Sequence, residues 1–333
     1  MSPPGGLPAT SRESAHVEDR VLTGRDGRQI AVRLVGPEGG VPVAWLHGFG
    51  GSRLEQHPDP SAAVELGVRV VAIDRPGTGG TSRLPGFTLS QVADDVAQVM
   101  DQLGHPRFAV AGLSWGGASA LATAALHPGR VTQLTLVSSV GGWLRGPGAM
   151  PDPGPNWVQV RRACASKALV RVAMAVTAWQ FRRRPEAALD RLAADAPRLD
   201  AAVLADPRLR AALRDKTTEA LRQGVDGLVD DTLAGALPWN IDLDAVSVPT
   251  TIWWGEADTE VGRVHLERLL TLLPHAQPRL VPAAGHLLHL ARWPDILQSA
   301  TIRTPSPHDR GRNASRGRAG QPASDRPTAE HQR

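Results

Sequence analysis

The chain has 333 residues, of which 41% are hydrophobic and 21% charged; this is enough for one large or two small domains and excludes a wholly disordered or fibrous protein. The single cysteine, Cys164, cannot form an intrachain disulfide, so we expect a reducing, cytoplasmic compartment. The formal net charge is +4, and residues 301–333 alone, with seven Arg and three acidic residues, account for 7 − 3 = +4. Because the rest of the chain is neutral, we do not expect nucleic-acid binding to be the main role.

Both ends of the chain lack the apolar residues that a folded core requires. Residues 1–20 are rich in Pro, Gly and charge, without the apolar run of a secretory signal, and residues 301–333 are dominated by Arg, Pro, Ser, Gly and Ala. We expect a disordered lead at 1–20 and a disordered tail at 301–333. The best internal candidate for a membrane segment, residues 168–179, contains Arg171 and is too short to span a bilayer, so no membrane association is expected.

Short β-branched or apolar runs alternate with helical patterns along the chain. The expected strands are Ile30–Val35, Val41–Leu46, Val68–Ile73, Phe108–Ala111, Leu134–Val137, Thr250–Trp254 and Arg279–Val281. The clearest helix is expected at residues 88–103, where Thr88 and Gln91 form a capping box and Gly104 follows the last turn. This alternation predicts an α/β fold, a mostly parallel sheet flanked by helices.

The alternation is interrupted between residues 141 and 240. A Gly/Pro-rich stretch, residues 141–155, leads into a long helical pattern rich in Ala, Leu and Arg, with Pro185, Pro197 and Pro207 at intervals. The pattern predicts an inserted subdomain of several short helices at 141–240. The α/β core would then consist of residues 21–140 and 241–300.

The strongest chemical motif is a glycine-flanked serine after the expected strand Phe108–Ala111, in the run Gly112-Leu113-Ser114-Trp115-Gly116-Gly117. A helical run, residues 118–126, follows it. A serine on such a sharp turn projects its hydroxyl above the sheet edge, and a Cβ at Gly112 or Gly116 would collide with the neighbouring strand and helix. Ser114 is therefore the candidate nucleophile.

A serine hydroxyl needs an imidazole to take its proton and a carboxylate to orient that imidazole. Asp258 follows the expected strand Thr250–Trp254, and His286 follows the strand Arg279–Val281. The chain order Ser, Asp, His is the one expected when each residue lies at the carboxyl end of a parallel strand. Glu256 remains an alternative acid and His289 an alternative histidine.

An oxyanion hole would need two backbone N–H groups beside the serine. The Gly-rich run His47-Gly48-Phe49-Gly50-Gly51 follows the strand Val41–Leu46 and can turn an amide toward the serine. We assign one donor to the backbone N–H of Phe49 and the other to that of Trp115. His47 is interpreted as a buried residue that braces this loop rather than as a base.

Over residues 21–300 the chain resembles the α/β-hydrolase superfamily, in the oxyanion loop, the Asp74-Arg75-Pro76-Gly77-Thr78-Gly79 turn, the serine motif, the acid and the histidine. The resemblance implies that residues 141–240 are a helical cap, and the Trp-Gly-Gly after Ser114 is similar to capped esterases and proline-iminopeptidase-like members. The peptidase-like His-Gly-Gly-Pro motif is absent, which argues against an aminopeptidase. Ser114 stands where dehalogenases and epoxide hydrolases of the superfamily carry aspartate, which argues against both chemistries.

These observations predict a cytoplasmic serine hydrolase acting through an acyl-enzyme on a small or medium apolar carboxylic ester, a small-molecule substrate, with no cofactor and no metal. Amide, thioester and carbon–carbon bond hydrolysis use the same triad and stay open. A triad-bearing protein that binds a ligand without hydrolysing it is the alternative from another class. Trp143, Trp157, Trp179 and Trp239 lie in or near the expected cap, and spacing does not reveal which of them line a pocket.

Overall fold

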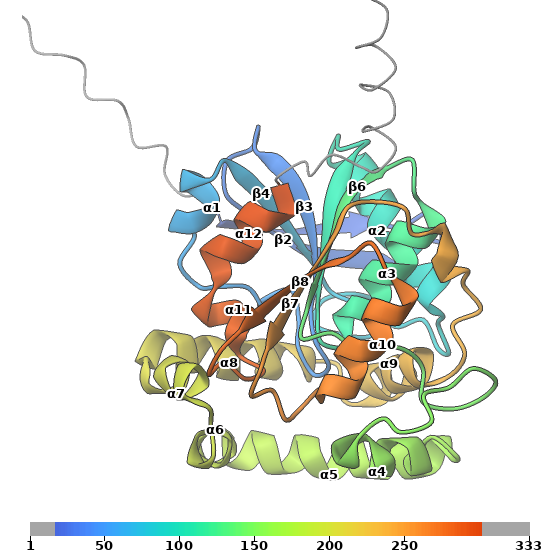
Figure 1. Ribbon diagram of the computed structural model, residues 1–333, viewed down its shortest axis with the longest axis vertical. Helices are drawn as coiled ribbons and strands as arrows, with labels where there is room; N and C mark the ends of the chain where they lie inside the picture. Colours follow the sequence, from blue (N-terminus) through green and yellow to red (C-terminus); the bar gives the residue numbers. More distant parts are fainter. Residues whose placement is uncertain (1–16, 302–333) are drawn as a thin grey trace, which may run out of the picture. The chain divides into compact units, whose positions relative to one another are not determined.

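One eight-stranded sheet lies at the centre of the computed structural model, which describes residues 17–301 (Figure 1). Its strands are β1 (Val17–Thr23), β2 (Gln29–Val35), β3 (Val41–Leu46), β4 (Val68–Ile73), β5 (Phe108–Leu113), β6 (Val131–Val137), β7 (Thr250–Gly255) and β8 (Gln277–Val281). They are ordered β1-β2-β4-β3-β5-β6-β7-β8. β2 pairs antiparallel with β1 and β4, and all other pairs are parallel. The mostly parallel α/β fold expected from the sequence is confirmed.

Twelve α-helices and one 3-10 turn are described, most of them between strands in the chain, with α11 and α12 after the last strand. They are α1 (Ser61–Glu65), α2 (Leu89–Gln102), α3 (Gly116–Leu126), α4 (Pro155–Ala163), α5 (Lys167–Arg183), α6 (Pro185–Ala194), α7 (Arg198–Ala205), α8 (Pro207–Ala220), α9 (Asp226–Ala236), the 3-10 turn η1 (Leu243–Ala245), α10 (Arg263–Leu272), α11 (Leu288–Ala291) and α12 (Trp293–Thr301). The capping box at Thr88 and Gln91 is present at the start of α2.

Both faces of the sheet are covered by helices. In β3, Ala44 and Leu46 belong to the core cluster that α2, α3 and α10 share, whereas Val43 and Trp45 belong to the cluster of α1 and α12. Successive residues of a strand point to opposite faces. This is why the central strands appear in the sequence as continuous apolar runs rather than as alternating patterns.

The expectation of a disordered lead at residues 1–20 is wrong for residues 17–20. They form the first half of β1, which pairs with β2 in a register from Val17 with Val35 to Thr23 with Gln29. β1 is an edge strand whose side chains are mostly exposed, so backbone hydrogen bonds rather than apolar burial hold it in place. Residue 301 also differs from the expectation, because it is the last residue of α12. The other residues expected to be disordered lie outside the described part of the chain.

Six helices, α4 to α9, lie between β6 and β7 in the chain and occupy one end of the sheet in Figure 1. We call residues 141–240 the cap region. The three prolines that interrupt its helical pattern stand at helix starts: Pro185 and Pro207 begin α6 and α8, and Pro197 directly precedes α7. A proline in the first turn of a helix has no amide hydrogen to leave unpaired. Among the described residues, no helix is long and apolar enough to cross a membrane.

Candidate active site

Ser114 occupies the sharp turn between β5 and α3. Its φ angle is +52°, a left-handed conformation that is rare for a residue with a side chain. A Cβ at Gly112 would lie 2.4 Å from the carbonyl oxygen of Gly116, and a Cβ at Gly116 would lie 2.2 Å from that of Leu46. Both glycines are thus required by the close approach of backbone segments, which is the steric reason inferred from the sequence.

Asp258 and His286 form a hydrogen-bonded pair at the same end of the sheet. His286 Nδ1 lies 2.9 Å from Asp258 Oδ2, and Asp258 Oδ1 accepts hydrogen bonds of 3.0 Å from the backbone N–H groups of Glu260 and Val261. The alternative acid, Glu256, is exposed to solvent. The carboxylate that contacts the histidine is therefore that of Asp258.

The pair shifts the pKa values of both members. Burial acts to raise the pKa of Asp258 and to lower that of His286. In both residues the charge of the partner and the hydrogen bond outweigh burial, so the pKa of Asp258 lies below its ordinary value and that of His286 above it. A histidine that is stabilised in its protonated form suits the acceptance of a proton from serine.

His289, the alternative histidine, has a different environment. It is buried, and neither ring nitrogen has a hydrogen-bond partner among the described residues. Burial lowers its pKa to about 3. Within the same part of the chain, no hydrogen bond joins Ser114 Oγ to either histidine. The structure therefore pairs the acid with His286. The hydrogen bond between a catalytic serine and its histidine is often long before substrate binds.

The loop after β3 lies directly beside the serine. A Cβ at Gly48 would come within 3.4 Å of Ser114 Cβ. The backbone N–H groups of Phe49 and Trp115 donate to no other group in residues 17–301, so both amides are free to meet an oxyanion. The rings of these two residues also meet edge to face, with centroids 6.1 Å apart.

Arg75 forms hydrogen bonds with the backbone of this loop, a role that the sequence did not reveal. Its guanidinium is fully buried, donates to the carbonyl oxygens of His47 and Gly48, and makes two hydrogen bonds of 2.7 and 2.8 Å to Asp231 of α9. The carbonyl oxygen of Asp231 accepts a hydrogen bond of 3.1 Å from Trp115 Nε1. One arginine thus connects the loop, the cap region and the residue after the serine.

His47 is part of the same bracing. Its Nε2 accepts a hydrogen bond of 3.2 Å from the backbone N–H of Arg75, and its Nδ1 lies 2.9 Å from the carbonyl oxygen of Gly48. Burial and the charge of Arg75 hold its pKa well below the ordinary value. A neutral histidine with both ring nitrogens engaged supports the structural interpretation of His47.

Glu55 provides a second brace. Its carboxylate accepts a hydrogen bond of 2.5 Å from the backbone N–H of Gly48 and forms an ion pair with Lys216 of α8. Burial acts to raise the pKa of Glu55, but the charge and hydrogen bond of Lys216, the charge of His289 and the hydrogen bond from the Gly48 N–H together outweigh it, so the pKa lies below the ordinary value. The acid therefore stays ionised beside the loop.

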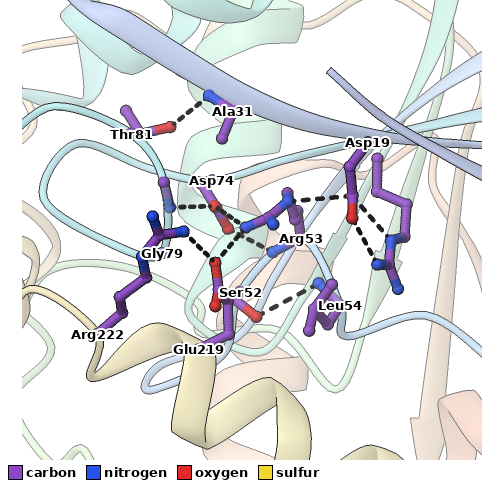
Figure 2. A network of polar contacts seen from close by, with 12 residues as sticks. Asp19, Ala31, Ser52, Arg53, Leu54, Asp74, Gly79, Thr81, Glu219 and Arg222 are labelled. Carbon is purple, nitrogen blue, oxygen red and sulfur yellow. Dashed lines mark hydrogen bonds and ion pairs between the residues drawn. The ribbon is translucent and has the colours of Figure 1, made fainter. Parts of the chain in front are cut away.

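Arg53 is the centre of a third network of polar contacts beside this loop (Figure 2). Its Nη1 lies 2.8 Å from Asp74 and 2.6 Å from Glu219 of α8, and its Nε lies 3.2 Å from Asp19 of β1. Asp74 also accepts a hydrogen bond of 2.9 Å from the backbone N–H of Gly80. This network joins the loop after β3, the turn after β4 and the cap region through one guanidinium.

Asp200 of α7 fixes the loop that carries the histidine. Its Oδ1 accepts a hydrogen bond of 2.7 Å from the backbone N–H of Gly285, and its Oδ2 accepts one of 2.9 Å from that of Leu287. The two amides flank His286. Asp200 was missed in the sequence because it is one of several acids in a helical pattern, and its partners are more than 80 positions away.

A cavity of about 180 Å³ adjoins the loop after β3, and its lining includes Phe49, Trp115 and Trp157. The indoles of Trp115 and Trp157 stack with centroids 5.4 Å apart and an interplanar angle of 6°. Of the four cap-region tryptophans considered, only Trp157 lines this cavity. Trp143 packs on Trp239 at 5.7 Å, and Trp179 is 55% exposed.

The chain matches the model of the α/β hydrolase fold family over residues 41–292. It is 37% identical over 119 residues to the dihydrolipoyllysine-residue acetyltransferase component of the acetoin cleaving system of Pseudomonas putida, a match that covers 34% of this chain and 31% of that protein. This chain therefore spans less than a third of that relative. It is 26% identical over 242 residues to a poly(3-hydroxyalkanoate) depolymerase of Ectopseudomonas oleovorans, with 69% of this chain and 72% of the relative covered.

Solved structures share the fold. A thermophilic esterase from Thermogutta terrifontis superposes with a TM-score of 0.61 at 24% identity, covering 86% of this chain and 96% of that one. The family match includes the strand and helix on either side of Ser114, as well as Asp258 and His286. By this match over most of its length, the chain belongs to the α/β-hydrolase fold family.

Proposed function

We propose that this protein is a serine hydrolase that cleaves a small or medium apolar carboxylic ester through an acyl-enzyme. The observation that carries the proposal is the 2.9 Å hydrogen bond between His286 and Asp258 at the carboxyl end of the sheet, where Ser114 also lies. A histidine oriented by a buried carboxylate is the group that a serine needs to become a nucleophile. The proposed substrate is a small molecule, and no cofactor takes part.

In the proposed reaction, Ser114 Oγ attacks the ester carbonyl carbon while His286 Nε2 takes the hydroxyl proton. Asp258 stabilises the resulting imidazolium, and the N–H groups of Phe49 and Trp115 hold the oxyanion. The imidazolium then gives its proton to the leaving alcohol, which leaves an acylated serine. Water, deprotonated by the same imidazole, releases the acid and restores the hydroxyl.

The lining of the cavity beside the loop after β3 supports the proposal that the substrate has an apolar acyl or alcohol group. Phe49, Trp115 and Trp157 present aromatic surface there, and Glu260 is the one charged lining residue. The depolymerase among the relatives is compatible with a hydrolytic role. The cytoplasm is the proposed compartment, since Cys164, the chain's single cysteine, is a free, buried thiol.

Amide, thioester and carbon–carbon bond hydrolysis would use the same groups. The alternative from another class is a protein that carries these residues but binds its ligand without acylation. A fluorophosphonate probe separates the hydrolases from the last of these, because it reacts with an activated serine whatever the natural substrate. Intact mass after incubation is the measurement.

We expect one adduct on the wild type and none on Ser114→Ala or His286→Ala. Ser119→Ala, which removes another buried hydroxyl one turn into α3, is the matched control and should be labelled like the wild type. Circular dichroism checks that each variant is folded. Labelling of folded Ser114→Ala would refute the assignment of the nucleophile, and an unlabelled, folded wild type would favour the ligand-binding alternative.

A further inference from the structure

The outer side of α5 carries an apolar strip that no other part of the described chain covers. The strip consists of four residues spaced three and four apart, with exposed fractions of 59%, 62%, 50% and 55%: Leu169, Val172, Val176 and Trp179. This spacing puts them on one side of the helix. Val170 and Ala178, which are buried, lie on the other side. Exposed apolar side chains gathered in this way mark an interaction surface.

The charged residues of the chain segment that carries the strip are all basic. Residues 155–184 contain seven basic residues and no acidic one: Arg161, Arg162, Lys167, Arg171, Arg182, Arg183 and Arg184. Lys167 and Arg171 form ion pairs with Asp230 and Asp226 of α9. The other five form no ion pair with a described residue, and Arg183 lies over the ring of Trp179 at 4.7 Å. The segment that carries the strip therefore has unpaired positive charge, and Arg183 lies against the strip itself.

Two neighbouring cavities lie between this strip and the loop after β3. A cavity of about 440 Å³ lies between α4 and α5, and Leu169 of the strip lines it. Val160, Met174 and Thr232 line both this cavity and the one that reaches Phe49 and Trp115. An apolar chain that entered beside α5 would thus pass along aliphatic side chains toward the oxyanion loop.

We propose that the α5 strip docks on the surface of an anionic lipid bilayer and that the cavity between α4 and α5 takes an acyl chain from that surface to Ser114. Apolar side chains in the centre and basic ones at the border are the composition of a helix that lies in the membrane interface. Such a helix does not span the bilayer, in keeping with the arginine at position 171. Figure 1 shows α4 and α5 as the layer of the cap region farthest from the sheet.

A second copy of the chain fits the same strip less well. In a symmetric dimer the same patch faces itself, so the uncompensated arginines of one copy would meet those of the other. Like charges across an interface oppose association. The negative surface potential of a cytoplasmic leaflet instead attracts each basic residue by about 1 kcal/mol. Charge complementarity therefore favours anionic lipid as the occupant.

The test uses the full chain in sedimentation with vesicles of phosphatidylcholine, alone or mixed with phosphatidylglycerol. We expect the wild type to bind the mixed vesicles, and the double variant Val172→Asp, Val176→Asp to bind them at least about tenfold more weakly, because both side chains would enter the interface. Leu126→Asp is the matched control: Leu126 is 42% exposed at the end of α3, outside the strip. It should bind like the wild type.

Three results would overturn the proposal. The first is no binding by the wild type. The second is equal binding by the double variant, which would assign the attraction to another surface such as the Arg-rich residues 302–333. The third is that, without lipid, the wild type is a dimer and the double variant a monomer. The delivery of an acyl chain rests on the proposed function, whereas docking does not. Ser114→Ala should bind vesicles like the wild type. Turnover of an ester carried in the vesicles, relative to a water-soluble ester, should fall in the double variant; an equal ratio would overturn the delivery step alone.

Discussion

The backbone conformation of Ser114 is held by its neighbours. A non-glycine residue in the left-handed region costs about 1–2 kcal/mol relative to ordinary backbone. The Ser114 N–H donates a hydrogen bond of 2.8 Å to the carbonyl oxygen of Val137, and its own carbonyl accepts from the N–H groups of Gly117 and Val140. These bonds come from β6 and its following loop as well as from α3. The hydroxyl is therefore presented by a turn that cannot relax without breaking contacts on both sides.

The pKa shifts of the acid–histidine pair predict how activity depends on pH. In the proposed reaction the base form of His286 takes the serine proton, so the rate of fluorophosphonate labelling should rise with pH through the pKa of His286, above its ordinary value of 6.5. Asp258→Asn removes the charge that raises this pKa and leaves the burial that lowers it. We expect labelling on the order of ten-thousandfold slower, with its midpoint moved to lower pH.

Glu256→Gln is the matched control for that substitution, because Glu256 lies two residues away on an exposed position. Its labelling rate and midpoint should equal those of the wild type. A midpoint that stays unchanged in Asp258→Asn, measured over the same pH range, would show that the carboxylate does not set the pKa of the histidine.

At the scale of elements, the sequence revealed what local pattern encodes. The central strands were found because burial on both faces makes them apolar throughout, and α2 because a capping box begins it. β1 was missed because an exposed edge strand needs only backbone hydrogen bonds. Residues 168–179 of α5 were considered only as a membrane-spanning candidate, because the direction in which their apolar side faces depends on packing.

In the candidate site too, some residues could be predicted from local pattern and others could not. Ser114, Asp258 and His286 follow strands that the pattern located, so their common edge could be inferred. The braces could not, because each joins residues far apart in the chain: Arg75 to Asp231, 156 positions on, and Glu55 to Lys216, 161 positions on. A charged residue in an amphipathic pattern is ordinarily solvated, and only the fold shows which ones are buried against a partner.

The contact of α7 with the histidine loop predicts a positioning role for Asp200. In Asp200→Asn an amide group replaces one of the two oxygens that accept from the N–H groups of Gly285 and Leu287. Leaving one buried donor unsatisfied costs about 1–3 kcal/mol. We expect fluorophosphonate labelling to slow by about ten- to a hundredfold, while the pH midpoint set by Asp258 and His286 stays in place.

An acid that caps a helix elsewhere in the cap region separates positioning from general loss of stability. Asp206 accepts hydrogen bonds from the N–H groups of Arg208 and Leu209 at the start of α8 and does not contact the histidine loop. Asp206→Ala, which removes the capping oxygen at a cost of about 0.5–2 kcal/mol, should lower the thermal unfolding midpoint without slowing the labelling. Equal slowing in both variants would mean that Asp200 acts only through stability.

At the scale of the whole molecule, buried and half-buried ion pairs join the cap region to the core. Arg75 with Asp231, Arg53 with Glu219, and Lys216 with Glu55 each link a loop at the carboxyl end of the sheet to α8 or α9. Removing one member of a buried pair leaves an uncompensated charge, which costs more than the pair itself contributes. The loops that hold the proposed oxyanion donors should therefore depend on the cap region for their shape.

Lys216→Met tests this dependence through stability. It leaves Glu55 buried without its cation, and we expect the free energy of unfolding to fall by about 2–4 kcal/mol at neutral pH. Without Lys216, burial raises the folded pKa of Glu55 above the unfolded value, so the folded state binds the proton more tightly and the deficit shrinks as pH falls through that raised pKa. Denaturant unfolding at about pH 7 and about pH 5 measures both quantities.

Two further variants complete that experiment. Arg222→Met breaks the pair with Glu219, in which the arginine side chain is 62% exposed, and should change the free energy of unfolding by less than about 1 kcal/mol. Adding Glu55→Gln to Lys216→Met removes the titrating group, so the pH dependence of the deficit should disappear. If the loss of unfolding free energy in Lys216→Met is the same at both pH values, its cause is lost packing of the lysine side chain rather than an unpaired carboxylate. The cap region is then joined to the loop after β3 by packing instead of charge.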